Sequence, residues 1–166
     1  MKCITAVIIA LLLVLPAQAR VPTRTVVGIV THVTDGDTLW IKAVNGGEAM
    51  DVRIQGIDAP ESCQDYGRIS QQALASHVWN QRLTLHIRAR DQYGRLIAKV
   101  NLGYQDVGGW MVANGHAWSY HFRRSAGPYA REEVAARQAG RGLWASGYPL
   151  EPRVFRKQTK CHKQHK

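Results

Sequence analysis

Cysteine, acidic residues and long hydrophobic runs are all scarce in this chain. Its 166 residues include three cysteines, and 12 Asp or Glu stand against 22 Lys or Arg, which gives a formal charge of +10. The long apolar run, residues 4–15, is shorter than the roughly 20 residues that a membrane-spanning helix needs, and this excludes an integral membrane protein. With 45% hydrophobic residues, the composition and length instead fit one globular domain.

The N-terminus has the pattern of a secretory signal peptide. Lys2 precedes the apolar run, and Ala17-Gln18-Ala19 follows it as a small-residue cleavage site. We expect residues 1–19 to be removed, which lowers the charge to +9 and leaves a secreted or periplasmic monomer with no stable membrane association. The alternative interpretation of this segment is a membrane anchor.

Export changes the interpretation of the cysteines. Cys63 and Cys161 would enter an oxidising compartment as an even pair, so a disulfide between them is possible, with two free thiols as the alternative. A zinc site from Cys161, His162 and His165, with or without Cys63, is disfavoured because the chain has no Cys-x-x-Cys pair.

Five strands are predicted: the first, over residues 26–33, from its many β-branched residues, and the others, over residues 39–44, 50–55, 83–89 and 96–102, from alternating apolar residues. Asn45-Gly46-Gly47 predicts a tight hairpin between the second and third strands. In the third strand, Met50, Val52 and Ile54 share the core face, so Arg53 should point away from the core.

Three helices are predicted between and after these strands. The first covers residues 65–81, where Ile69, Ala73, Leu74 and Val78 recur at helical spacing. The second is capped by Asp106 and stops near residue 114, and the third opens at Gly127-Pro128 and runs to about residue 140. The predicted fold class is α+β, mainly β: a five-stranded Greek-key barrel of the OB type with three helices.

Residues 149–166 form a tail whose charge differs from that of the domain over residues 20–148. Residues 152–166 contain six Lys or Arg and no acid, so they carry +6 of the +9 charge. They are either a solvated, disordered basic end or a nonspecific tether for a polyanion, whose binding would release counterions.

Acidic residues meet around the first hairpin. Asp37 opens the second strand, and Asp58 and Glu61 follow the third, so the hairpin should bring them close together. Two adjacent carboxylates repel unless a cation lies between them, and oxygen-only ligands suit Ca²⁺ or Mg²⁺. The alternative is that these acids only cap turns.

Arg53 and Arg95 favour the metal site over simple turn capping. A guanidinium is permanently charged and offers a planar fork that fits phosphate oxygens. The alternative is that each arginine pairs with a surface acid. A metal, a candidate base and two arginines in one groove would make a phosphodiesterase site.

Three motifs contain these residues: VTDGDTL (residues 33–39), VRIQGIDAPE (52–61) and DQYGRLIA (91–98). Together, in this order, they resemble the staphylococcal nuclease (thermonuclease-like) family, and the resemblance extends over residues 26–144. It implies an OB-fold barrel with three helices that uses Ca²⁺ to hydrolyse DNA and RNA. The P–O5′ bond would be cut and a 3′-phosphate left, as in a micrococcal-type endonuclease.

By motif position, the resemblance also implies site roles, with Asp35 as a further acid near the metal. Ala59 replaces the threonine of the type member, but its backbone carbonyl can still serve as a ligand. The implied residues are the metal ligands Asp37, Asp58 and Ala59; the catalytic residues Arg53, Glu61 and Arg95; and the substrate-binding residues Tyr93 and Tyr120.

The sequence therefore predicts an exported, Ca²⁺-dependent, sugar-nonspecific nuclease. The alternative is a non-catalytic OB-fold module that binds nucleic acid, with Trp40 or Trp118 as a stacking platform. The complete set of acids and arginines favours catalysis.

Overall fold

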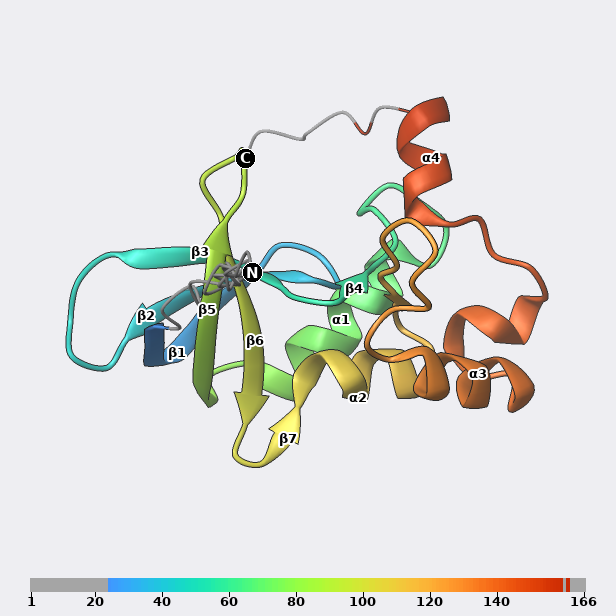
Figure 1. The fold of residues 1–166 in the computed structure, drawn as a ribbon. Helices are drawn as coiled ribbons and strands as arrows, with labels where there is room; N and C mark the ends of the chain where they lie inside the picture. Colours follow the sequence, from blue (N-terminus) through green and yellow to red (C-terminus); the bar gives the residue numbers. More distant parts are fainter. Residues whose placement is uncertain (1–23, 160, 162–166) are drawn as a thin grey trace, which may run out of the picture.

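The computed structural model describes residues 24–159 and 161, and its centre is a closed barrel of five strands (Figure 1). Antiparallel pairing runs in the order β3-β2-β1-β5-β6, and parallel pairing of β3 with β6 closes the barrel. This confirms the predicted mainly-β class. The strands are β1 (Arg24–Val33), β2 (Thr38–Ala43), β3 (Ala49–Ile54), β5 (Arg82–Arg90) and β6 (Leu96–Leu102).

The alternation read from the sequence corresponds to burial inside the barrel. Val52 and Ile54 of β3 are buried, Met50 is half-buried, and Arg53 between them faces the other side. Gly46 and Gly47 have φ values of 95° and 98° in the β2–β3 loop, a conformation that glycine adopts without steric cost. The predicted strands and the hairpin are confirmed, but the loop over residues 44–48 is longer than the tight turn that was expected.

The helices lie on one side of the barrel, away from the β2–β3 hairpin (Figure 1). Helix α1 (Gly67–Val78) packs against β1 through Leu74 and Val78, but Ile69 is 52% exposed and does not belong to the packed face. Helix α2 (Val107–Ala113) follows β7 (Gln105–Asp106), and the Asp106 carboxylate accepts a hydrogen bond from the Gly109 N–H at 3.2 Å, as expected of an N-cap.

The predicted start of the third helix was wrong. Helix α3 (Ala130–Gln138) begins after Tyr129, whose φ and ψ of −116° and 29° are not helical. The Tyr129 N–H donates to the Ser119 hydroxyl at 3.0 Å, and this contact with a residue ten positions earlier holds Tyr129 in the loop before the helix. A short 3₁₀ helix, η1 (Gly142–Ser146), follows α3.

A two-stranded sheet and a fourth helix complete the described fold. Strand β4 (Ile57–Asp58) pairs with β8 (Trp118–Ser119), which places Asp58 opposite Trp118. Within the basic tail, residues 152–158 form α4 (Pro152–Gln158), so this part of the tail is an ordered element with Pro152 buried in its first turn.

Two earlier expectations fall outside the described residues: the signal peptide over residues 1–19, and His162 and His165 of the disfavoured zinc site. Across residues 24–159 and 161, no helix combines the length and the apolar character that crossing a bilayer requires.

Candidate active site

A groove of ≈ 1560 Å³ opens beside the ends of β2 and β3. Most of the residues proposed from the sequence line it, whereas Asp58 does not line it and contacts the lining residues Arg53 and Arg156. The lining residues among those proposed are Asp35, Asp37, Arg53, Ala59, Glu61, Tyr93, Arg95 and Tyr120.

Asp37 is fixed by a tight turn between β1 and β2. It is 2% exposed, and its carboxylate accepts hydrogen bonds from the Thr38 hydroxyl at 2.9 Å and the Ala59 N–H at 2.9 Å. In the same turn, the Asp37 N–H donates to the Asp35 carboxylate at 3.0 Å. Because its polar contacts come from two segments, the Asp37 side chain has little freedom to move.

The turn depends on Gly36. A Cβ at this position would lie 1.9 Å from the Ser70 hydroxyl oxygen and 2.7 Å from the Ala59 Cβ. We therefore expect Gly36→Ala to lower the free energy of unfolding by about 1–3 kcal/mol, because α1 and the residue 59 loop must move apart. Urea unfolding measures the change, and an unaltered midpoint would contradict this packing.

Arg53 joins the two aspartates that the sequence predicted to meet. Its Nη1 lies 2.6 Å from Asp37 Oδ1, and its Nη2 lies 2.9 Å from Asp58 Oδ1. Burial by itself lowers the pKa of Arg53, but the charges of Asp37 and Asp58 outweigh that effect and the net pKa is raised. Asp37, Arg53 and Asp58 thus form one charged network that reaches the groove through Asp37 and Arg53.

Asp35 adds a third carboxyl group to this end of the barrel. Burial and the nearby charge of Asp37 raise the pKa of Asp35 to about 8. Burial is the larger of these two causes, so the raised pKa reflects a desolvated carboxyl group with a second acid beside it.

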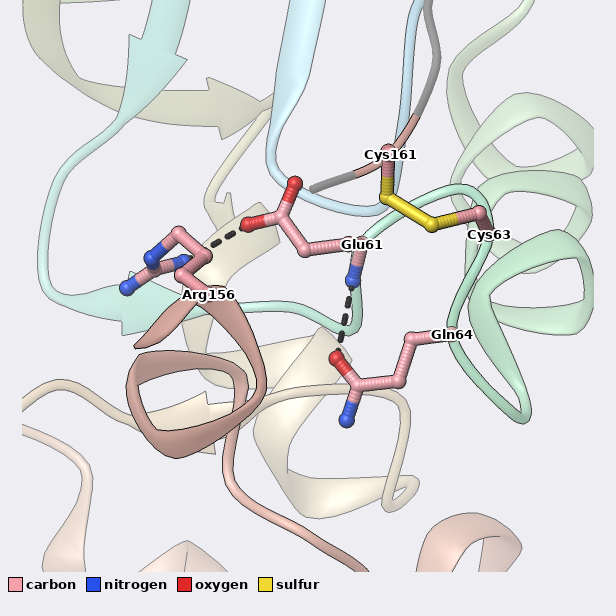
Figure 2. Close-up of a disulfide and its surroundings, with 5 residues drawn as sticks. All are labelled: Glu61, Cys63, Gln64, Arg156 and Cys161. Carbon is pink, nitrogen blue, oxygen red and sulfur yellow. Dashed lines mark hydrogen bonds and ion pairs between the residues drawn. A yellow bond between two sulfur atoms is a disulfide. The ribbon is translucent and has the colours of Figure 1, made fainter. Parts of the chain in front are cut away.

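Glu61 follows Pro60 in the loop that leads to α1. Its backbone N–H donates to the Gln64 side-chain oxygen at 3.2 Å, and its carbonyl accepts from the Gln64 N–H at 2.9 Å. A Cβ on Gly67 would lie 1.9 Å from the Glu61 carbonyl oxygen, so glycine permits this close turn. The half-exposed Glu61 carboxylate is 2.8 Å from Arg156 Nη1, as Figure 2 shows.

Arg95 reaches the site from the loop between β5 and β6. Asp91 orients it by accepting from Arg95 Nε at 2.8 Å and from its backbone N–H at 3.0 Å. Arg95 Nη1 lies 3.3 Å from the Thr38 hydroxyl, which itself bonds Asp37. This chain of contacts links Arg95 to the aspartate network.

The aromatic candidates differ in exposure. Tyr93 is 75% exposed, and the Arg95 guanidinium lies over its ring, 5.6 Å from the ring centre. Tyr120 lines the groove and is 44% exposed. Trp118 was a wrong choice of stacking platform, because it is 3% exposed and packs edge-on against Trp144. Trp40 is 38% exposed and remains accessible.

Cys63 and Cys161 form a disulfide with sulfurs 2.01 Å apart, across 98 residues of sequence (Figure 2). Both sulfurs are bonded to each other and are therefore not available to the zinc site considered above. Among the described residues, no group of three or more His, Cys, Asp or Glu side chains is arranged to hold a metal ion.

The part of the chain that contains most of these groove residues also matches a known protein family. The sequence profile described as "Staphylococcal nuclease homologue" matches residues 51–146. This chain belongs to the staphylococcal nuclease family. The protein is therefore a nuclease, a hydrolase whose substrate is nucleic acid.

Relatives of this nuclease occur in bacteria and plants. An "Uncharacterized endonuclease" of Haemophilus influenzae is 34% identical over 133 residues, 80% of this chain and 74% of its own length. Another from Escherichia coli O157:H7 is 36% identical over 130 residues, 78% and 84% of the two chains. The rice protein "Probable staphylococcal-like nuclease CAN3" is 34% identical over 113 residues, 68% of this nuclease but only 30% of the plant protein.

One functional candidate in the nuclease was missed from the sequence: Arg156 of α4. Its guanidinium contacts both Asp58 and Glu61, although 95 residues separate it from Glu61 in the chain. The available signal was the cysteine pair, because Cys63 stands two residues after Glu61 and Cys161 five residues after Arg156. A disulfide between them brings the basic tail to the acids.

Proposed function

We propose that this protein is an exported, Ca²⁺-dependent nuclease that hydrolyses the P–O5′ bonds of DNA and RNA and leaves 3′-phosphate ends. The observation that carries the proposal is the connected network of Asp37, Arg53 and Asp58, with Glu61 and Arg95 beside it on the same groove. Export is supported by the signal-like N-terminus and by a disulfide, which persists in oxidising compartments.

The residues at the base of the groove fit a hard divalent cation. Asp37, Asp58 and the Ala59 carbonyl are oxygen donors, which Ca²⁺ prefers, and water or substrate oxygens would complete the shell. Asp35, whose carboxylate accepts from the Asp37 N–H, adds a further carboxyl group beside these donors. When bound, the ion would neutralise charge on the scissile phosphate and activate a water molecule.

The two arginines bind and orient the phosphate. A guanidinium has five N–H donors. Arg53 directs donors to Asp37, Asp58 and, at 3.5 Å, the Ile57 carbonyl, so N–H groups remain for a phosphate oxygen. Arg95 is held by Asp91 before substrate arrives, so little reorganisation is needed when negative charge builds up in the transition state.

Glu61 orients the attacking water and accepts its proton. Its carboxylate is half-exposed at the groove, and its backbone is fixed by Gln64. A carboxylate within hydrogen-bonding reach of the water typically contributes about 10²–10⁴ in rate. In this role Glu61 must be free to face the substrate, which requires Arg156 to give up at least part of its contact.

A non-catalytic binding module is the second candidate function. Trp40 and Tyr93 are exposed aromatic side chains that could stack on bases. The acids Asp37, Asp58 and Glu61 favour catalysis over binding alone, because a binding module needs basic and aromatic groups but no cluster of acids.

An end-group assay tests the proposed chemistry. Labelled single-stranded DNA and RNA of one sequence are each incubated with Ca²⁺, and with excess chelator. We expect cleavage of both substrates only with Ca²⁺, and products with 3′-phosphate and 5′-hydroxyl ends. Products with 5′-phosphates, or cleavage that ignores the chelator, would contradict the proposed mechanism, and a gel shift without products would favour the binding module.

A further inference from the structure

Arg156 extends from α4 into the acidic end of the groove. Its Nη2 lies 3.0 Å from Asp58 Oδ2, and its Nη1 lies 3.2 Å from Asp58 Oδ1 and 2.8 Å from Glu61 Oε1. The guanidinium therefore forks onto one buried carboxylate while also binding the candidate base, as Figure 2 shows for Glu61. Charge-assisted, forked contacts of this kind are the stronger class of hydrogen bond.

Helix α4 is held in this position by contacts at both of its ends. After it, Cys161 is bonded to Cys63, in the same loop as Glu61. Before it, the Gln64 side-chain amide donates to the Leu150 carbonyl at 2.6 Å, and at its first residue Pro152 is buried. Because the link is covalent, Arg156 stays near the two acids at a high effective concentration even when its own contacts break.

The same carboxylate oxygens would be needed by a divalent cation. Asp58 Oδ1 already accepts from Arg53 at 2.9 Å, so the fork of Arg156 brings a second guanidinium to this carboxylate. A cation and the Arg156 guanidinium at Asp58 would repel each other at close range. A cation bound at Asp58 therefore disfavours the contact between Arg156 and Asp58, and that contact disfavours cation binding.

We propose that Arg156, held over the groove by the Cys63–Cys161 disulfide, competes with the divalent cation for Asp58 and so sets the cation concentration at which this nuclease works. The inference rests on the proposed metal dependence. It assigns the tail a role at the active site, in contrast to both a solvated end and a general polyanion tether. Arg156 acts here through the metal ligands and is not a catalytic residue.

The direct test is calorimetric titration of Ca²⁺ into the full chain without substrate. We expect Arg156→Gln to lower the Ca²⁺ dissociation constant by about fivefold to tenfold, because the competitor is removed. Lys157→Gln is the matched control: it removes the same charge from an exposed position of the same helix that lines neither the groove nor the hollow beside Asp58, and the Ca²⁺ affinity should stay that of the wild type. Equal affinity in the wild type and Arg156→Gln would overturn the inference.

A second variant tests the tether without changing any charge. Cys63→Ser combined with Cys161→Ser should also tighten Ca²⁺ binding, by a smaller factor, because Arg156 can then leave the site. When Arg156→Gln is added to this double variant, the Ca²⁺ affinity should equal that of Arg156→Gln alone, because the tether then has no competitor to hold. Unchanged affinity in the cysteine variant would show that the disulfide does not act through Arg156.

Kinetics separate competition from the other roles that Arg156 could have. At saturating Ca²⁺ we expect Arg156→Gln to keep the wild-type kcat and the KM for DNA, with half-maximal activity at lower Ca²⁺. A fall in kcat or a rise in KM at saturating Ca²⁺ would overturn the proposal in favour of a phosphate-binding role. If no variant binds Ca²⁺ and hydrolysis ignores the chelator, the proposed function itself fails.

Discussion

Replacing Glu61 by glutamine is expected to lower kcat by about 10²–10⁴ while leaving the fold intact. Glutamine has nearly the shape of glutamate, and the backbone contacts with Gln64 do not depend on the Glu61 carboxylate. What disappears is the group that accepts a proton from water. The measurement is single-turnover cleavage of a labelled DNA strand at saturating Ca²⁺, with circular dichroism to verify folding.

Glu48→Gln is the matched control for this change. Glu48 is exposed in the β2–β3 hairpin and does not line the groove. Its substitution removes one negative charge from the surface, and kcat should not change. If Glu61→Gln cleaved at the wild-type rate, Glu61 could not be the residue that handles the attacking water.

Arg95→Lys is expected to lower kcat by about 10²–10³, although the positive charge is kept. Lysine lacks the planar fork that lets Arg95 bond Asp91, reach Thr38 and still face a phosphate. The loss should fall mainly on kcat, because preorganised donors matter most when charge develops in the transition state.

Arg82→Lys provides the comparison for Arg95. Arg82 is exposed at the start of β5 and does not line the groove. Steady-state kinetics on one DNA substrate should show the wild-type kcat for Arg82→Lys. A rise in KM with unchanged kcat for Arg95→Lys would mean that Arg95 binds substrate and transition state equally, contrary to the proposed role.

Local patterns were sufficient to predict the barrel. Alternation in residues 50–54 located the core face of β3 because a strand has a strict two-residue period. Helix faces were predicted less well: Ile69 has helical spacing from Ala73, yet the packed face of α1 is centred on Ser70, Leu74 and Val78. The Ser119 hydroxyl that delays the start of α3 lies ten residues earlier, outside any local pattern.

The site was predictable where one hairpin connects its members. Asp37 and Asp58 flank paired strands, so their approach follows from the connectivity, and Arg53 joins them. Arg156 was not predictable in this way, because a helix in a basic tail can lie anywhere until a covalent link is known. The disulfide supplies that link, and the sequence alone could only state it as possible.

The central claim is that Asp37 and Asp58 together bind one divalent cation on which hydrolysis depends. The most direct measurement is Ca²⁺ titration calorimetry of the wild type and of Asp37→Asn, paired with the cleavage rate at each free Ca²⁺ concentration. The account predicts one Ca²⁺ per chain in the wild type, a cleavage rate that rises with its occupancy, and loss of both in Asp37→Asn. Full cleavage by a wild-type chain that binds no Ca²⁺ would contradict it.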